Sequence, residues 1–472
     1  MSVEKVKFII DPGYIPAKEL EKIISEYEIS HDVSVVYARP RNKSRWSKNN
    51  FPEISTSYDE IEEVVQSNKK YLPDVYIDKL ISLINDHRTL LLCERCRNRR
   101  YGVSLFNELR RIEKMLYGSF VYLNSKKPEF LLLFSTPHHP RVWALAMAAE
   151  YISIPVYIVE EAPIPWRYWL ISGIDSRKCV PLFEVDKKNK ITSTLSAEVE
   201  QFIKYKNQSY KDAIPYYEKE RIEARGGKYW SWRKEISDHK FHLVSLLKKW
   251  RLFKSYYQFV NTTEIDAPYL VFFMHRQPER TSLPEGMSFS QQWYAIRAIS
   301  LALPPGYRLY VKEHPSTFTN ITDERYRHKG FYSDIDALTN TFLLPLEEDT
   351  FQLIDNAVAV CTLTGIVGIE ALTRGTPVIA FGNPSYRSAP GVFIASNEND
   401  ISAAINKINL THNEKDLTSA VRQYLQWVVK NSVSGFEQDE IDYSYYPEKV
   451  RIAGHIRLLK RLLDYTKEHQ EL

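Results

Sequence analysis

The sequence is poor in cysteine, with only Cys93, Cys96, Cys179 and Cys361 in 472 residues. Four thiols in a chain of this length give no disulfide framework, which excludes the class of small disulfide-stapled secreted domains. Cys93 and Cys96 form a lone CxxC pair, and no matching pair stands nearby to complete a zinc site. We interpret them as reduced thiols at the end of a buried strand, LLLCE.

Long apolar runs and a large excess of one charge are also missing. No apolar run approaches the ~20 residues of a membrane-spanning helix, and the opening MSVEKVKFIIDPG lacks the apolar core of a secretion signal. Lysine and arginine total 63 against 59 aspartates and glutamates, a net charge of +4. This excess is too small to indicate a nucleic-acid partner, but it suits a ligand with phosphate or acidic sugar groups. We expect a cytoplasmic protein.

Strand and helix signals alternate along most of the chain, which predicts an α/β fold with mostly parallel sheets. The length allows two domains, each with its own core. Predicted strands include KVKFII, VSVVYA, PEFLLLFS and IPVYIVEE in the first half, and YLVFFMH, YRLYVKE, NTFLLPL, AVAVCTLT and TPVIAFG in the second. The segments between them, such as LFNELRRIEKMLYGSFVYL and QQWYAIRAISLAL, have helical periodicity.

We place a first α/β domain at residues 1–192 and a second at residues 263–410. Residues 411–472 are predicted to be helical. Residues 193–262 are basic, aromatic and helical, and we interpret them as an interdomain insert. Two interpretations of its Trp230, Trp232 and Trp250 stay open: they contact a membrane surface or an acidic glycan, or they pack inward behind a solvated face.

A predicted strand in VAVCTLTGIVGIEALTRGTPVIAFG ends in hydroxyl residues and opens directly into a predicted helix. Backbone N–H groups and the helix dipole make such a helix start an anion site, and Gly365 and Gly368 let a phosphate approach the backbone. Thr362 and Thr364 are candidate phosphate ligands, although Thr364 is also suited to capping the helix. Glu370 lies further along, where its carboxylate could reach ribose hydroxyls.

A second polar cluster, Lys312-Glu313-His314-Pro315-Ser316, follows the predicted strand YRLYVKE. A histidine at a strand's carboxyl end can donate N–H to a phosphate oxygen, and when protonated it offsets the charge of a leaving phosphate. Because side chains alternate along a strand, only some of this cluster can face one site. A simple turn is the alternative interpretation of the His-Pro pair.

A third polar cluster is the loop HRQPERT at residues 275–281, after the predicted strand YLVFFMH. It supplies a candidate catalytic carboxylate, Glu279, and candidate contacts to phosphate or an acidic sugar, namely His275, Arg276, Gln277 and Arg280, with Lys312 as a further one. Parallel strands present their carboxyl ends at one edge of a sheet, where ligands bind. The three clusters are therefore expected to share one rim.

In the first domain, polar clusters stand at residues 135–139 (STPHH) and at the adjacent carboxylates Glu160 and Glu161. Either glutamate could act as a general acid or base if burial raises its pKa. A solvated pair in a loop is the alternative, and the sequence does not decide between the two.

HRQPERTSLPEG, YVKEHPS and TLTGIVGIEALTRGTPVIAFG, in this order, resemble the capsule polysaccharide biosynthesis family, which includes bacterial Kdo transferases that act on CMP-Kdo. The resemblance covers about residues 269–386, with a looser likeness over KPEFLLLFSTPHHPRVWALAMAAEYISIPVYIVEE. It implies a GT-B glycosyltransferase, in which two Rossmann-like domains face each other across a cleft and the C-terminal domain holds the donor. It also implies that the final helices cross back to the first domain.

The His-Pro pair is similar to one in bacterial GT-B sialyltransferases and glycerolphosphate polymerases, which use CMP- or CDP-linked donors. This similarity implies donor contacts from His314, Pro315, Ser316, Thr362, Thr364 and Gly365, although Leu363 separates two threonines that those families often place side by side. We find no Asp-x-Asp motif suited to a diphosphate donor, and a CMP-sugar carries one phosphate. A site without metal or other cofactor is consistent with both points.

Three functions remain open. The first is a glycosyltransferase of capsule or lipopolysaccharide synthesis that transfers Kdo or a related acidic sugar from a CMP-linked donor to an oligosaccharide or lipid-linked glycan, with peripheral contact to the inner membrane. The second keeps the fold but takes a UDP-sugar, as a transferase or a UDP-sugar 2-epimerase-like enzyme. The third is a non-catalytic capsule assembly protein that binds glycan through residues 193–262.

Overall fold

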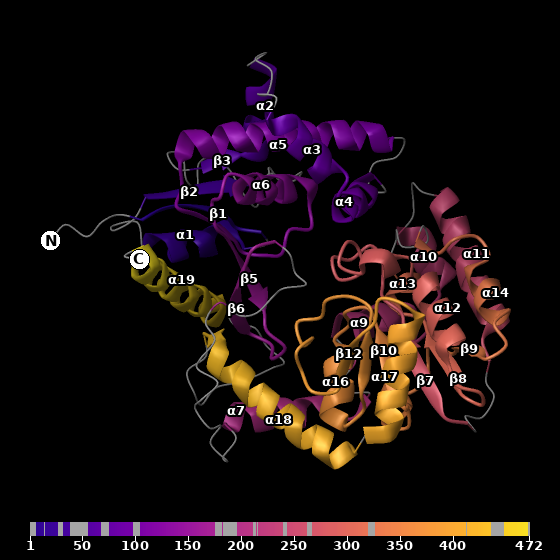
Figure 1. Cartoon of the computed structure of the whole chain (residues 1–472). Helices are drawn as coiled ribbons and strands as arrows, with labels where there is room; N and C mark the ends of the chain where they lie inside the picture. The colour runs from indigo at the N-terminus through magenta and orange to yellow at the C-terminus, as the bar shows by residue number, and fades with distance from the viewer. Residues whose placement is uncertain are drawn as a thin grey trace. The chain divides into compact units, whose positions relative to one another are not determined.

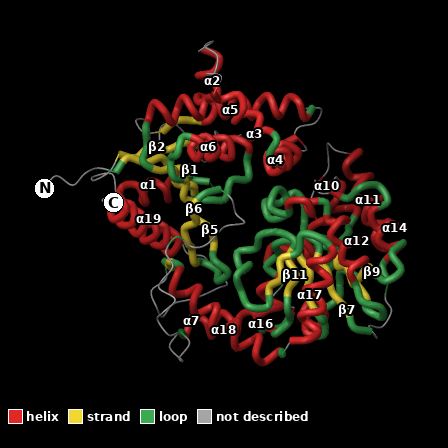
Figure 2. Tube along the Cα trace, viewed as in Figure 1, coloured by secondary structure: helices red, strands yellow, loops and turns green. Residues whose placement is uncertain are grey.

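The computed structural model describes residues 6–13, 15–26, 32–37, 55–67, 75–97, 104–174, 182, 196–210, 214, 216–238, 243–261, 267–319, 326–411, 413–435 and 448–470. The chain divides into two compact units, Met1–Thr194 with Leu425–Leu472, and Leu195–Tyr424. Each unit has a largely parallel sheet with helices packed against it (Figures 1 and 2). The predicted α/β class with two Rossmann-like domains is thereby confirmed.

The first unit alternates strands and helices over its N-terminal part. Its elements are β1 Lys7–Asp11, α1 Ala17–Ser25, β2 Asp32–Tyr37, β3 Ser55–Ser57, α2 Tyr58–Ser67, α3 Val75–Ile84, α4 His87–Arg97, α5 Leu105–Lys126, β4 Phe130–Leu133, α6 Pro140–Tyr151, β5 Val156–Glu161 and β6 Arg167–Ser172, followed after the second unit by β13 Val433–Ser434 and α19 Glu448–Gln470. The strands form one sheet in the order β13-β6-β5-β4-β1-β2-β3.

Side chains of β1 alternate between the two faces of this sheet, as a strand with both faces buried requires. Ile9 packs in the cluster that includes α5 and α6, whereas Phe8 and Ile10 pack with α1 and α19. Arg451 of α19 donates through Nε to Glu19 Oε2 of α1 at 2.6 Å. The C-terminal helix is thus a structural layer of the first unit.

One strand prediction in the first unit was wrong, and so was the alternative that Glu160 and Glu161 lie in a loop. LLLCE lies inside helix α4, where Cys93 is buried. A short apolar run is compatible with either a buried strand or a buried helix, and the flanking residues continue the helix here. Glu160 and Glu161 do not lie in a loop, because they are the last two residues of β5. RYWLIS forms the next strand, β6. It pairs antiparallel with β5, with Glu160 opposite Trp169 and Glu161 opposite Tyr168.

The second unit begins with helices and continues as an alternating α/β domain. Its elements are α7 Ala197–Lys206, α9 Tyr216–Glu223, α10 Trp232–Asp238, α11 Leu243–Phe259, β7 Tyr269–Phe273, the 3₁₀ helix Met287–Ser290, α12 Gln292–Ala302, β8 Arg308–Lys312, α13 Ser316–Thr319, α14 Phe331–Asp336, β9 Thr341–Leu344, α15 Thr350–Asp355, β10 Ala359–Thr362, α16 Val367–Arg374, β11 Val378–Ala380, β12 Val392–Ile394, α17 Glu398–Thr411 and α18 Glu414–Asn431, the last of which crosses the unit boundary.

The sheet of the second unit runs in the order β12-β11-β10-β7-β8-β9, with every neighbouring pair parallel. Leu270 and Phe272 of β7 pack with α11, α12, α14 and α17 on one face. On the other face, the Tyr269 hydroxyl donates to the Leu353 carbonyl of α15 at 2.8 Å. The carboxyl ends of β10, β7 and β8 are therefore adjacent, and the three predicted polar clusters follow these strands.

Residues 193–262, predicted to be an insert, belong to the second unit from residue 195 onward. Buried ion pairs connect their helices, since Glu235 lies between Arg225 at 2.8 Å and Lys249 at 2.7 Å. The Trp230 ring stacks on Phe253 with centroids 5.2 Å apart, and Trp232, which is 44% exposed, lies against Trp250. Among the described residues, no helix combines the length and apolar character needed to cross a bilayer.

Candidate active site

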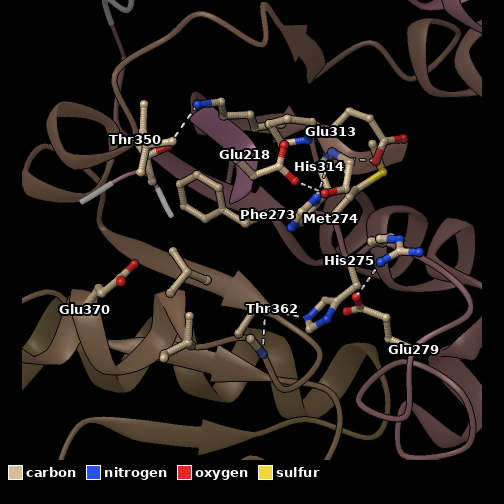
Figure 3. A pocket seen from close by; sticks show the side chains of 18 of the residues that line it. Glu218, Phe273, Met274, His275, Glu279, Glu313, His314, Thr350, Thr362 and Glu370 are labelled. Carbon is tan, nitrogen blue, oxygen red and sulfur yellow. Dashed lines mark hydrogen bonds and ion pairs between the residues drawn. The ribbon is translucent and has the colours of Figure 1, made fainter. Parts of the chain in front are cut away.

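A cavity of about 630 Å³ opens where β7, β8 and β10 end (Figure 3). Every residue that lines it belongs to the second unit. The lining comprises Tyr210, Ile214, Glu218, Arg221, Ile222, Tyr229, Phe273, Met274, His275, Arg276, Glu279, Thr281, Lys312, Glu313, His314, Pro315, Ser316, Thr350, Phe351, Thr362, Thr364, Gly365, Ile366, Val367 and Glu370. The three clusters singled out on the sequence thus share one cavity.

His314 stands at the end of β8 with a defined ring orientation. Its Nδ1 accepts the backbone N–H of Ser316 at 3.1 Å, so the proton of the neutral ring is on Nε2. Burial lowers the pKa of His314 to about 4, against the opposing charge of Glu313. At pH 7 the ring is therefore a neutral N–H donor. The imidazolium that the sequence also allowed is disfavoured.

His275 organises the turn between β10 and α16. Its Nε2 lies 3.0 Å from the Thr362 hydroxyl and accepts the Thr364 N–H at 3.3 Å. Thr362 Oγ1 in turn accepts the Gly365 N–H at 3.2 Å. Burial lowers the pKa of His275 to about 3, with the charge of His314 as the next cause. The neutral ring thus uses its Nε2 lone pair to hold the turn, which sequence reasoning did not foresee.

The start of α16 faces the cavity without a side-chain cap. The residue at the N-cap position is Ile366, which makes no side-chain capping bond. The Thr364 hydroxyl instead donates to the Thr281 carbonyl at 2.8 Å, so the capping role considered for Thr364 is wrong. Ile366 and Val367 line the cavity. The N–H groups of Gly368 and Ile369 in the first turn donate to the Gly365 and Ile366 carbonyls at 3.0 Å. The N–H groups of Ile366 and Val367 are therefore the backbone donors that this end of α16 offers to an anion.

Gly368 has a packing role and does not line the cavity. A Cβ at this position would lie 2.1 Å from the Tyr386 hydroxyl oxygen, and that hydroxyl donates to the Gly365 carbonyl. At Gly365, a Cβ would lie 2.7 Å from Thr362 Oγ1. In the Gly-x-x-Gly pattern, Gly365 therefore leaves room for the Thr362 hydroxyl and Gly368 for the Tyr386 hydroxyl.

Gly368→Ala is expected to destabilise the protein by about 1–3 kcal/mol, because overpacking displaces the Tyr386 ring from a close-packed site. Urea unfolding of the purified variant measures this loss. Combining it with Tyr386→Phe, which removes the crowded oxygen, should recover part of the stability. An unchanged unfolding midpoint in Gly368→Ala would contradict the packing role.

A buried network of hydrogen bonds lies behind the residues that line the cavity. Glu313 accepts from Arg327 at 2.8 Å, from the Tyr332 hydroxyl at 2.7 Å and from the His314 N–H at 2.8 Å. Arg327 also donates to the His275 carbonyl at 3.0 Å and to Gln277 Oε1 at 3.0 Å. The network ties the end of β7 to the end of β8. Gln277, predicted as a sugar or phosphate contact, is part of this buried network and does not line the cavity.

The charged groups that line the cavity are mostly paired. Arg276 lies 3.4 Å from Glu279, whose side chain is 43% exposed, and Glu370 lies 3.0 Å from Lys206. Lys312 Nζ donates to the Glu348 carbonyl at 2.5 Å and to the Thr350 hydroxyl at 2.8 Å. Burial lowers the pKa of Lys312 to about 8. Figure 3 shows Glu370 and Glu279 on opposite sides of the cavity.

The remaining predicted residues lie elsewhere. Arg280 pairs with Glu285 at 3.7 Å and does not line the cavity. Glu160 and Glu161 belong to the first unit, and the cavity lining does not include them.

Sequence reasoning missed the residues that α9 and its surroundings bring to the cavity, namely Tyr210, Glu218, Arg221 and Tyr229. Glu218 accepts the Ser316 hydroxyl and pairs with Arg221 at 3.2 Å. Burial raises the pKa of Glu218, against the charge of Arg221. The only signal in the sequence was the mixture of charge and aromatic residues, which surface helices also show.

The two cavity histidines predict a loss of stability in acid. Their pKa values of about 3 and about 4 lie below the 6.5 of an unperturbed imidazole. Below pH 6.5 the unfolded chain therefore takes up protons that the folded chain does not, and the free energy of unfolding falls as pH drops from 6.5 towards 4. Urea unfolding between pH 7.5 and 4.5 checks this. His275→Gln should make the free energy of unfolding less dependent on pH. The same dependence in the variant and the wild type would contradict a neutral, buried His275.

The sequence comparison with known families gives one match. Residues 297–435 match the model of the family described as capsule polysaccharide biosynthesis protein. The predicted resemblance is confirmed over this segment. The segment contains His314, Thr362, Thr364 and Gly365, whereas the loop at residues 275–281 precedes it. No curated protein matches the sequence.

Solved structures of similar outline include β-Kdo 2,7-transferase KpsC of Thermosulfurimonas dismutans, with 13% identity, TM-score 0.29 and coverage of 85% of this chain and 90% of that one. Another is a putative UDP-N-acetylglucosamine 2-epimerase of Listeria monocytogenes, with 13% identity, TM-score 0.28 and coverage of 99% and 97%. A third is the Methanocaldococcus jannaschii UDP-GlcNAc 2-epimerase in complex with UDP-GlcNAc and UDP, with 15% identity, TM-score 0.25 and coverage of 89% and 99%. At these scores the likenesses identify no ligand or reaction for this chain.

Proposed function

We propose that the protein is a nucleotide-sugar-dependent glycosyltransferase of capsule or related surface polysaccharide synthesis, and that the cavity binds the donor. The observation that carries the proposal is the convergence of His314, the His275–Thr362 turn and the uncapped start of α16 on one cavity. All but His275 lie within the segment that matches the capsule family. Neutral N–H donors and a helix start are the groups that hold a phosphate without a resident cation.

The donor phosphate is placed between His314 and α16. His314 Nε2–H donates to a phosphate oxygen, and the backbone at the start of α16 binds the others. When the glycosidic bond to phosphate breaks, negative charge grows on the leaving phosphate, and donors already aimed at it stabilise the transition state. The bound phosphodiester carries one negative charge and becomes a dianion as the bond breaks, which raises the pKa of His314 from its low value, so the ring can take up a proton as the charge develops.

We further propose a CMP-linked acidic sugar such as Kdo as the donor, without a metal or other cofactor. Glu370, at the side wall, is the candidate contact for ribose hydroxyls. Glu279 is a candidate catalytic carboxylate, because it lines the cavity and its side chain is 43% exposed. Glu160 or Glu161 of the first unit is the other candidate, together with a glycan acceptor bound there. A cytoplasmic location with peripheral contact to the inner membrane completes the proposal.

A panel of nucleotide sugars tests the function directly. The purified protein is incubated with CMP-, CDP- and UDP-linked sugars and a mixture of glycan acceptors, and released nucleotide is quantified. Release of CMP that depends on the acceptor supports the proposal. If none of the three nucleotides is released, and none raises the thermal unfolding midpoint, the glycosyltransferase assignment is rejected.

One observation favours keeping a UDP-sugar-dependent enzyme, a transferase or a 2-epimerase-like one, as the second candidate. Arg221 and Arg276 both line the cavity that contains His314, and guanidinium groups are suited to the second phosphate of a diphosphate donor. Thermal shift with CMP and UDP separates the candidates, because a shift with UDP and none with CMP removes the CMP-sugar donor.

A further inference from the structure

Helix α9 brings a guanidinium into the cavity from outside the sequence motifs. Arg221 lines the cavity, and its side chain is 33% exposed. Its Nη1 donates to the Ser316 hydroxyl at 3.2 Å and to Glu218 Oε1 at 3.2 Å. Ser316 immediately follows the His314-Pro315 turn. Arg221 is therefore held beside the turn that carries the proposed phosphate donor.

A buried ion network fixes α9 in this position. Arg225, one turn after Arg221, donates to the Arg221 carbonyl at 2.9 Å and to the Thr319 carbonyl at 2.9 Å. Its Nε donates to Glu235 at 2.9 Å, and Glu235 also accepts from Lys249 at 2.7 Å. Burying three charges has a desolvation cost that their attraction only roughly offsets. The network thus does more to specify where α9 lies than to add stability, and it ties α9 to the helix that follows His314.

Arg221 and Arg276 together make a cationic wall next to His314. Arg276 comes from the loop after β7, and the charges of both arginines help to lower the pKa of His314. The donors at the start of α16 lie on another part of the cavity wall. One phosphate bound between His314 and α16 accounts for those groups, but it leaves the arginine wall without an assigned ligand. Planar guanidinium groups suit phosphate or carboxylate oxygens, which they can bind in pairs.

Glu218 is part of the same wall and differs from an ordinary ion-pair partner. Its side chain is 6% exposed, and its Oε2 is buried without a hydrogen-bond partner among the described residues. Burial raises its pKa, so a second anion nearby favours the protonated, neutral carboxyl. The charged and polar groups that face Glu218 come from several elements. They are Arg221 in α9, Arg225 just after α9, Arg276, the Ser316 hydroxyl and Tyr210.

We propose that Arg221, with Arg276, forms a second anion subsite beside the phosphate site at His314, which binds a second acidic group of the donor. The group is either the second phosphate of a nucleoside diphosphate or the carboxylate of an acidic sugar, and both present the same oxygen chemistry to a guanidinium. The inference rests on the proposed function, because it takes the first phosphate to be bound at His314.

Isothermal titration of the full chain with Arg221→Gln tests the subsite. The ligands are CMP, CDP, CMP-N-acetylneuraminate and inorganic pyrophosphate. The matched control is Arg233→Gln, which changes an exposed arginine on neighbouring α10. We expect Arg221→Gln to weaken CDP or CMP-N-acetylneuraminate at least about tenfold, as for loss of one charge-assisted hydrogen bond, while CMP changes less than about threefold. Arg221→Lys retains the charge without the fork, and an intermediate loss excludes misfolding as the cause.

The outcomes distinguish the two candidate acidic groups, a second phosphate and a sugar carboxylate. Weakening of CDP alone identifies a second phosphate, and weakening of CMP-N-acetylneuraminate alone identifies the sugar carboxylate. Weakening of both identifies a shared subsite. Equal weakening of CMP, or no weakening of any ligand, overturns the subsite. A wild-type protein that binds no nucleotide rejects the proposed function instead. The subsite then stands only if pyrophosphate binds and Arg221→Gln weakens it, and it falls if pyrophosphate does not bind.

Discussion

His314→Ala is expected to lower nucleotide-sugar turnover by roughly 10²–10³-fold, the effect typical of removing one preorganised donor to a developing negative charge. The ring is aligned by the Ser316 N–H on Nδ1 and is neutral at pH 7, so Nε2–H is available to the donor phosphate. The loss should appear mainly in kcat, because the charge that His314 meets grows in the transition state. Initial rates of nucleotide release measure it.

The control is His328→Gln in the same unit. His328 is 37% exposed in its side chain and pairs with Asp334 at 2.8 Å, away from the cavity lining. This variant should retain turnover within about twofold, because substitution of an exposed side chain away from the cavity has little effect on the folded structure. If His314→Ala turned over every donor of the panel at the wild-type rate, the assignment of His314 to the donor phosphate would be wrong.

Arg327→Met is expected to lower the free energy of unfolding by about 3–5 kcal/mol, the range for removing one partner of a buried ion pair. Both side chains of the Arg327–Glu313 pair are nearly inaccessible, at 1% and 0% exposed. Burial alone would raise the pKa of Glu313, but the charge and hydrogen bonds of Arg327 hold it below its usual value. Without Arg327, Glu313 must either stay charged in the interior or take up a proton. Urea unfolding at pH 7 measures the loss.

Two variants complete this test. Arg327→Met combined with Glu313→Gln should be more stable than Arg327→Met alone, because the orphaned charge is gone. The pair Arg422–Glu200 has the same chemistry at 2.6 Å but is 40% and 51% exposed, so Arg422→Met should cost no more than about 1 kcal/mol. Equal losses in Arg327→Met and Arg422→Met would contradict the structural role of the buried network.

The second sheet and its site edge could be predicted because local patterns and tertiary structure agree there. Each apolar run is short, ends in polar residues and precedes a helix, as in β10, Thr362 and α16. Parallel pairing then brings the ends of neighbouring strands together whatever the details of packing. This is why His275, His314 and Thr364, which are far apart in the chain, were correctly expected at one rim.

The sequence predictions that were wrong or incomplete concern contacts between residues far apart in the chain, which local sequence patterns do not encode. The sequence does not reveal that Thr364 donates to the Thr281 carbonyl, or that Gly368 accommodates Tyr386, because both partners are remote in the chain. α9 escaped notice for a similar reason. The sequence of α9 alone does not show which way Arg221 faces. The buried Arg225–Glu235–Lys249 network, with the bonds of Arg221 to Ser316 and Glu218, places it at the cavity. The helix α4 was missed because an apolar run alone does not distinguish a helix from a strand.

A crystal structure of the protein with CMP tests the central claim most directly. The account predicts the phosphate within hydrogen-bond distance of His314 Nε2 and of the backbone N–H groups at the start of α16, with the ribose on the side of Glu370. CMP bound outside this cavity, or with its phosphate turned away from His314 and α16, would contradict the account.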